Sequence, residues 1–154
     1  MKFLYSDTQD YVDPEYNFLE DRNAPGRKRY WDDMYAHEML NPAPYDGLLV
    51  SMSAIRAADG VAKSKVRYTT AEEQRFLRDG ARKFLRYGGP RFAKSMLMGD
   101  CGAFAYVEHE YPAYKPEEVV EFYDEAGFTH GVSPDHIIFD CDLSNPPSSV
   151  VPEA

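Results

Sequence analysis

Two acidic residues, Asp100 and Asp135, each follow an apolar stretch that has the composition of a buried β-strand. The stretches are residues 95–98 and a segment around residues 129–133. α/β enzymes place their chemistry at the C-terminal ends of parallel strands, where carboxylates can exchange protons with a substrate. We therefore interpret the two acids as candidate site residues. The alternatives are a loop-capping role for Asp100 and an N-cap or surface position for Asp135.

The residues that follow Asp100 are suited to holding a flat ligand. Gly102 and Ala103 are small, so a ligand can approach the backbone closely at this point. Phe104 then offers an aromatic ring on which a planar molecule can stack. Packing of Phe104 in the core is an equal alternative.

Residues 100–104, with the sequence Asp-Cys-Gly-Ala-Phe, resemble the Asp-Ser-Gly-Gly-(Phe/Tyr) motif of the tRNA-guanine transglycosylases. They are more similar still to the form usual in the DNA-acting relatives, the DpdA-like DNA-guanine transglycosylases. The downstream order is also similar, with a helix that begins at Pro116 and ends at Gly127, followed by a strand that ends at Asp135. Further stretches that resemble DpdA are residues 5–14, 32–38 and 44–51, so the resemblance extends to about residue 142.

The resemblance implies an enzyme that exchanges guanine in DNA for a 7-deazaguanine such as 7-cyano-7-deazaguanine, with tRNA as the rival substrate. The base exchange is a pentosyl transfer through a covalent intermediate on an acidic nucleophile, and no cofactor or metal is implied. In the family this nucleophile is an Asp on a later strand. We therefore expect it beyond the end of this chain, and we assign no residue to it.

The resemblance also implies roles for individual residues. Asp100 is the catalytic residue that moves protons to and from the base. Asp135 accepts hydrogen bonds from the guanine edge, with Asp140 as a rival because Phe139-Asp140 also looks like the family's Phe-Asp. The other expected substrate-binding residues are Phe104, which stacks on the base, Gly102 and Ala103, which let it approach, and His136, which orients Asp135 or contacts the substrate.

Two weaker candidates lie near the N-terminus. Asp7 and Gln9 follow a short expected strand and can line the same face as the two acids. A basic cluster comprises Arg22, Arg27, Lys28 and Arg29, followed by Tyr30 and Trp31. The cluster is either a solvated loop or an arm that contacts phosphates and stacks on a base.

Composition favours a protein of the cytoplasm. The chain has 154 residues and a net charge of -9, which argues against strong nucleic-acid binding by this segment alone. We find no apolar run long enough to span a membrane and no signal peptide. Cys101 and Cys141 are expected to be buried free thiols rather than a disulfide.

The expected fold class is α/β, because strands and helices alternate along the chain. We predict strands at residues 3–5, 47–52, 95–98 and 129–133, and helices at 30–40, 70–87 and from Pro116. About four βα units are present, whereas a closed (β/α)₈ barrel needs eight. The prediction is therefore a partial (β/α) barrel of the TIM type, with the N-terminal half of a transglycosylase-like barrel in residues 1–142 and a linker-like tail in residues 143–154.

Two other functions remain open. A truncated, non-catalytic homologue can bind a base or DNA, or it can complement a second-half polypeptide or form a homo-oligomer through its exposed sheet edge. A different α/β enzyme, such as a sugar-phosphate aldolase or decarboxylase, can use Asp100 and Asp135 as acid and base. The sequence lacks the Gly-rich phosphate loop before a helix that would support the last alternative.

Overall fold

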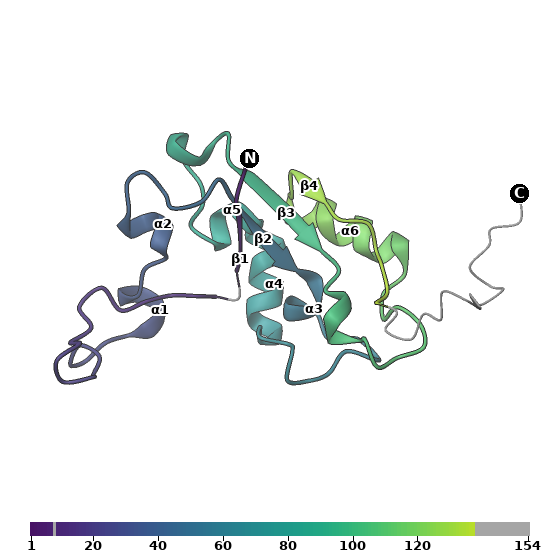
Figure 1. Ribbon diagram of the computed structural model, residues 1–154, viewed down its shortest axis with the longest axis horizontal. Helices are drawn as coiled ribbons and strands as arrows, with labels where there is room; N and C mark the ends of the chain where they lie inside the picture. The colour runs from purple at the N-terminus through teal and green to yellow at the C-terminus, as the bar shows by residue number, and fades with distance from the viewer. Residues whose placement is uncertain (8, 138–154) are drawn as a thin grey trace, which may run out of the picture.

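The computed structural model describes residues 1–7 and 9–137, and these form a parallel sheet with helices (Figure 1). The strands are β1 Leu4–Ser6, β2 Gly47–Ser51, β3 Met96–Asp100 and β4 His130–Gly131. They lie side by side in the order β1-β2-β3-β4, and each neighbouring pair is parallel. The predicted parallel α/β arrangement is therefore confirmed for the described residues. Asp140, Cys141 and the tail of residues 143–154 lie outside them.

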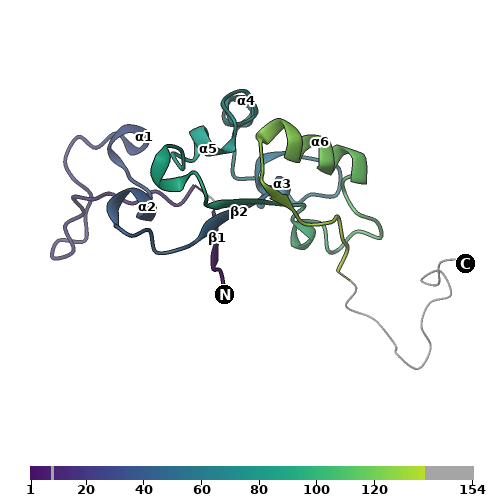
Figure 2. The same cartoon turned by 90° about the horizontal axis from the view of Figure 1, so that it is seen from above.

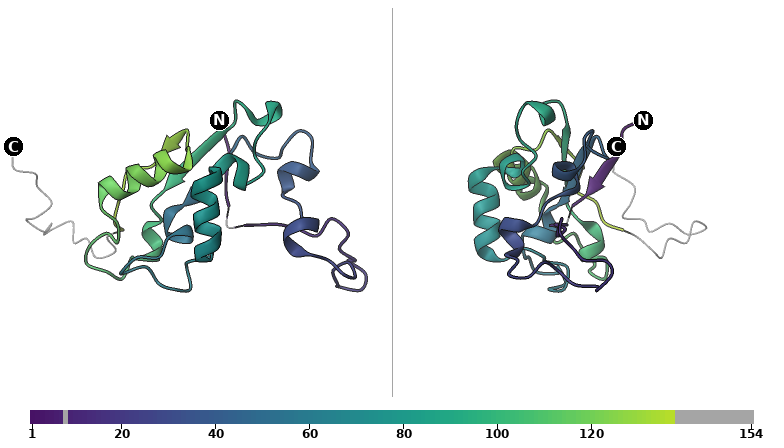
Figure 3. Two further views of the ribbon diagram at one scale, coloured as in Figure 1. Left: turned by 180° about the vertical axis from the view of Figure 1, so that it is seen from behind. Right: turned by 90° about the vertical axis from the view of Figure 1, so that its left-hand side faces the viewer.

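The helices are short, except for two. The α-helices are α1 Arg29–Asp32, α2 Ala36–Met39, α3 Met52–Ile55, α4 Thr70–Asp79, α5 Ala81–Phe84 and α6 Pro116–Ala126. Two 3₁₀ turns complete the described elements, η1 Pro90–Phe92 and η2 Ala103–Ala105. The segment with α1 and α2 lies at the opposite side of the molecule from α6 (Figures 1 and 3).

The sheet has one covered and one open face. The helices α4, α5 and α6 lie on the same side of it, and no α-helix of the described residues lies on the other side (Figure 2). Side chains alternate along β2 and β3 accordingly, so Leu48, Val50 and Leu97 are fully buried while Leu49 and Met98 are only partly buried. The open face therefore presents apolar side chains as well as the strand-end residues of the site.

Aromatic side chains fill the layer between the sheet and the helices. The Phe76 ring lies 5.2 Å from that of Phe84 and 6.3 Å from that of Phe122, measured between ring centroids. Within residues 70–87, Phe76, Ala81, Phe84 and Leu85 are buried, and Leu77 is partly buried. The core thus joins α4, α5 and α6 into one layer behind β2 and β3.

The helix ends follow local capping rules. The capping box of α4 pairs Thr69 with Glu72. Gly80 has a φ of 78° and separates α4 from α5, so the single predicted helix of residues 70–87 is divided. Gly127 ends α6 in the left-handed conformation, with a φ of 71°, as predicted.

The predicted helix of residues 30–40 is wrong. Two single turns, α1 and α2, replace it because Met34 pairs with Val12 through backbone hydrogen bonds of 2.9 Å in both directions. This pairing holds the chain extended between the turns. Tyr35 is buried, whereas Trp31 is 77% exposed.

Candidate active site

A cavity of about 410 Å³ lies at the C-terminal end of the sheet, and we call it the acid pocket. The residues that line it come from β2, α3, the loop that follows α3, β3, the turn into η2 and the segment after β4. They are Ser51, Ser53, Ala54, Lys65, Arg67, Asp100, Gly102, Ala103, Phe104, Ala105, Asp135 and Ile137. Five of the six residues predicted for the site therefore meet here, and His136 is not among them.

Asp100 is held by the neighbouring strand. It ends β3, and the parallel register places it beside Ser51, the last residue of β2. The Ser51 hydroxyl donates a hydrogen bond of 2.7 Å to Asp100 Oδ2. This contact fixes the carboxylate at the strand ends and leaves its other oxygen, Oδ1, outside that bond.

Cys101 and Tyr106 hold Asp135 in place through hydrogen bonds. The Cys101 thiol donates to Asp135 Oδ1 at 3.2 Å, and the Tyr106 hydroxyl lies 3.1 Å from both Cys101 Sγ and the Asp135 backbone carbonyl. Burial raises the pKa of the Cys101 thiol above its ordinary value, so the group keeps its proton at neutral pH. Cys101, predicted to be a buried free thiol, is both buried and free.

The loop between the two acids forms the wall of the pocket. Gly102 adopts the left-handed conformation with a φ of 80°, and it turns the chain from β3 into η2. Ala103 is buried behind this turn, whereas the Phe104 ring is 70% exposed. The structure therefore places Phe104 on the surface beside the acids, not in the core.

Gly102 also makes a contact that excludes any side chain. A Cβ atom at this position would lie within 1.9 Å of Ser53 Oγ and 2.8 Å of Ser53 Cβ. Gly26 has a similar φ of 76°, but an added Cβ there would have no atom within 4 Å.

We expect Gly102→Ala to lower the free energy of unfolding by about 1–3 kcal/mol more than Gly26→Ala does. Both positions have backbone strain, but only at Gly102 does the added Cβ also clash with another residue. Urea denaturation of the two variants measures the difference. Equal losses of stability would show that the Ser53 contact relaxes without cost.

Two cations line the pocket together with the two acids. Lys65 and Arg67 are exposed and lie on the loop between α3 and α4. Backbone hydrogen bonds fix this loop, from Ala62 to the Ala105 carbonyl at 3.1 Å and from Arg67 to the Ala54 carbonyl at 2.7 Å. The site thus carries positive charge despite the acidic chain.

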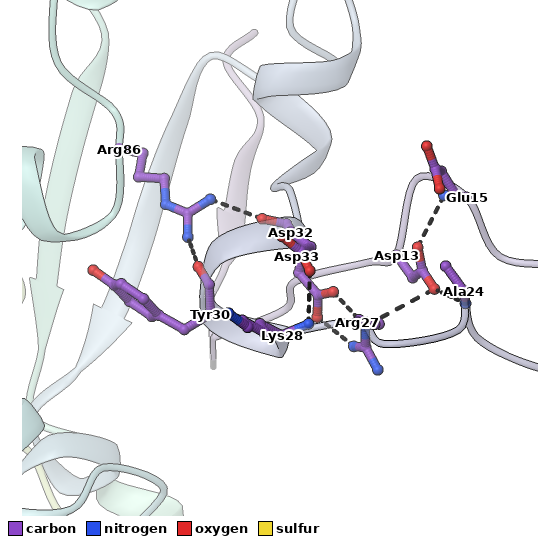
Figure 4. Close-up of polar contacts among 9 residues, drawn as sticks. All are labelled: Asp13, Glu15, Ala24, Arg27, Lys28, Tyr30, Asp32, Asp33 and Arg86. Atoms are coloured by element: carbon purple, nitrogen blue, oxygen red, sulfur yellow. Dashed lines mark hydrogen bonds and ion pairs between the residues drawn. The ribbon is translucent and has the colours of Figure 1, made fainter.

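Arg27 of the N-terminal basic cluster is occupied by internal contacts (Figure 4). Arg27 makes a two-pronged contact with the buried carboxylate of Asp33. Arg86, which follows α5, donates to the Asp33 carbonyl at 2.8 Å and to the Tyr30 carbonyl at 2.5 Å, and so fixes α1 against the segment after α5. The phosphate-arm interpretation does not hold for Arg27, whose guanidinium is committed to this network.

His136 and Asp7 lie elsewhere. The Nε2 atom of His136 lies 2.6 Å from the His109 carbonyl, so the ring is directed to that loop while its neighbours Asp135 and Ile137 line the pocket. Such an alternation is usual along an extended chain. Asp7 is 1% exposed, and its carboxylate accepts from the backbone N–H groups of Gln9 and Asp10 at 3.2 and 3.4 Å. Neither Asp7 nor Gln9 lines the acid pocket, in contrast to the sequence-based expectation.

The sequence interpretation missed Ser51, Lys65 and Arg67 as pocket residues. The sequence could have indicated Ser51 as a pocket residue, because it ends an apolar strand as Asp100 does. Lys65 and Arg67 lie in a segment that reads only as loop. Among residues 1–7 and 9–137, no group of three His, Cys, Asp or Glu side chains is placed to hold a metal ion. None of the helices in that part is long and apolar enough to cross a membrane.

Comparison with known proteins assigns the family. No protein-family model matches the chain. A curated DNA-guanine transglycosylase from Salmonella montevideo is 42% identical to it over 139 residues, which are 90% of this chain. The chain belongs to the guanine transglycosylase family.

The family resemblance stated from the sequence is thus confirmed, but the match covers only part of the relative. The aligned residues make up 32% of that protein, so this chain spans about a third of its length. Asp100, Gly102, Ala103 and Phe104 of the motif, together with Asp135, are among the residues that line the acid pocket. The activity of the whole protein is a separate question.

Proposed function

We propose that this chain supplies the base-binding part of an enzyme that exchanges guanine in DNA for a 7-deazaguanine, such as 7-cyano-7-deazaguanine. The observation that carries the proposal is the acid pocket, in which Asp100, Asp135 and Phe104 line one cavity. The relative is named a DNA-guanine transglycosylase, and this supports DNA over tRNA as the polymer.

In the proposed reaction the bond between the sugar C1′ and guanine N9 breaks, and C1′ bonds to an acidic nucleophile. Guanine leaves with a proton on N9. The incoming 7-deazaguanine then loses its N9 proton and attacks C1′, which releases the nucleophile. We assign the proton transfers to Asp100, whose Oδ1 is not engaged by Ser51. We expect the nucleophile outside this chain.

The remaining pocket residues recognise the base. Asp135 accepts from the N1–H and the exocyclic amine, which guanine and 7-deazaguanine share. Phe104 stacks on the base, and Gly102 with Ala103 lets it approach the backbone. We assign to His136 a positioning role, because it fixes the segment after β4 to the His109 carbonyl.

We also propose that the sheet is part of a larger (β/α) barrel of the TIM type. The sequential order of four parallel strands with α4, α5 and α6 on one side supports this proposal. The open face, with Leu49 and Met98, would then be the barrel interior. Residues 1–142 would form the N-terminal half.

The open face also favours a second candidate, a non-catalytic homologue that binds base or DNA, or that complements a second-half polypeptide or a second copy of this chain. The deciding experiment is incorporation of labelled 7-cyano-7-deazaguanine into duplex DNA by the full-length protein, with tRNA as the control polymer. Label in DNA supports the transglycosylase. Binding of DNA without any incorporation would favour the second candidate, and label in tRNA alone would overturn the choice of polymer.

Asp135→Asn is expected to weaken discrimination for guanine-type bases by about 1–3 kcal/mol, because an amide turns a donor toward the donors of the base. The measurement is competition between 7-deazaguanine and 7-deazaadenine for the site. Tyr106→Phe removes only the hydroxyl behind Cys101 and should shift the same ratio by a smaller amount. An unchanged base preference in Asp135→Asn would remove this residue from base recognition.

A further inference from the structure

A second cavity, of about 460 Å³, lies directly beside the acid pocket. It shares Lys65, Phe104 and Ala105 with the acid pocket. Its remaining lining residues are Gly60, Val61, Ala62, Tyr106, Val107, Glu108 and His109. The exposed Phe104 ring thus lies on the boundary between two cavities.

We propose that this second cavity is a subsite for the nucleotide next to the one that is exchanged. The inference rests on the proposed function, because it requires a polynucleotide whose target base enters the acid pocket. Phe104 would separate the two bases, and Lys65 would contact the phosphate that links them. The exchange would then depend on the base beside the target.

The chemistry of the second cavity suits a base better than a phosphate. Val61 and Tyr106 are buried and give it an apolar floor, to which the Phe104 ring adds a flat face. Its rim carries the acid Glu108 and the imidazole of His109, and a carboxylate repels a phosphate but can accept hydrogen bonds from a base. Stacking of a base on an aromatic ring is tolerant of sequence and contributes substantially to single-strand binding.

Lys65 is placed to meet the phosphate because it lines both cavities. Its backbone N–H donates to the Ala62 carbonyl at 2.8 Å, and Ala62 in turn donates to the Ala105 carbonyl at 3.1 Å. The loop that carries the cation is thus bound to the wall that carries Phe104. Of the two cavities, Arg67 lines only the acid pocket, so it faces the target nucleotide in this arrangement.

The test uses the full-length protein and DNA oligonucleotides with a single target guanine and an abasic residue on its 5′ or 3′ side. Loss of the neighbouring base on one of the two sides should weaken binding by about 5- to 150-fold. Ala62→Trp fills the second cavity from an exposed position and should abolish this dependence. Ala71→Trp, at an exposed position of α4, is the matched control and should behave as the parent.

Salt dependence provides an independent measurement for Lys65. Lys65→Ala should reduce the slope of log affinity against log salt concentration by about 1. Lys94 lies before β3 at the other end of the sheet, so Lys94→Ala should leave the slope unchanged. Equal affinities for all abasic oligonucleotides, or a full abasic effect in Ala62→Trp, would overturn the subsite. Base exchange by the same protein is measured in parallel. Exchange without neighbour dependence removes only the subsite, and neighbour dependence without exchange removes only the catalytic proposal.

Discussion

Replacement of Asp100 with Asn in the full-length protein is expected to lower the rate of base exchange by about 10²–10⁴-fold. The amide has the size of the carboxylate and can still accept the hydrogen bond that Ser51 donates. The loop and the pocket should therefore keep their shape. The amide cannot take up a proton, so both halves of the exchange lose the group that moves protons to and from the base.

The measurement is single-turnover release of guanine and uptake of labelled 7-deazaguanine by duplex DNA. Ser51→Ala is the matched variant, because it keeps the carboxylate and removes only the hydroxyl that holds it. We expect it to retain most of the activity. Wild-type rates in Asp100→Asn, with an unchanged melting temperature, would exclude Asp100 as the proton-transfer group.

The sequence predicted β2 and β3 well because each consists mainly of apolar residues, which is typical of strands in a parallel sheet. Gly127 marked the end of α6 because only a residue without a side chain tolerates the left-handed turn easily. The 30–40 segment failed for a non-local reason. Its apolar residues have helical spacing, but the backbone pairing of Met34 with Val12 outweighs that local preference.

The buried side of α6 does not follow from its apolar residues alone. Val120 is 54% exposed, whereas Phe122 is fully buried. Both residues are apolar, so the pattern alone allows a rotation of the helix. The sheet decides it, because Gly99 leaves a gap beside the Tyr123 ring, where a Cβ atom would lie only 2.4 Å away.

The site was predicted where it lies within one short segment and missed where it depends on register. Asp100, Gly102 and Phe104 are close in sequence, so their types and order already describe a pocket wall. Ser51 reaches Asp100 across 49 positions, and only the pairing of β2 with β3 brings them together. Lys65 meets the pocket through a loop whose hydrogen bonds have no local sequence signal.

Asp7→Asn is expected to change the pH dependence of stability more than any other single substitution of an acid proposed above. Burial raises the pKa of Asp7 from 3.8 to about 6 in the folded protein, against the smaller opposite effect of the Gln9 and Asp10 N–H groups. Between these values the folded state holds a proton that the unfolded state has lost, so stability falls as the pH rises through this range. A shift of this size corresponds to about 3 kcal/mol of unfolding free energy.

Asn stays neutral at every pH. The unfolding free energy of Asp7→Asn should therefore rise by about 3 kcal/mol relative to that of the parent between a pH below 4 and pH 8. It gives up one of the two carboxylate acceptors, and this loss is the same at every pH. Urea denaturation across this pH range measures the difference in unfolding free energy between the variant and the parent. Asp124→Asn, on the exposed side of α6, is the control. A pH-independent gap would show that the Asp7 carboxylate is solvated in the native state.

The same variant separates a structural acid from a catalytic one. Buried carboxyls with raised pKa values occur preferentially at functional sites, and Asp7 follows β1 at the strand ends where the acid pocket also lies. Its hydrogen bonds, however, go to the backbone of its own loop, and it does not line the pocket. We therefore expect base exchange by Asp7→Asn to stay within a few-fold of the parent at pH 8, with the unfolding free energy measured under the same conditions. A loss as large as that of Asp100→Asn in a variant that remains fully folded would place Asp7 in the catalytic machinery, because a loop anchor cannot account for it.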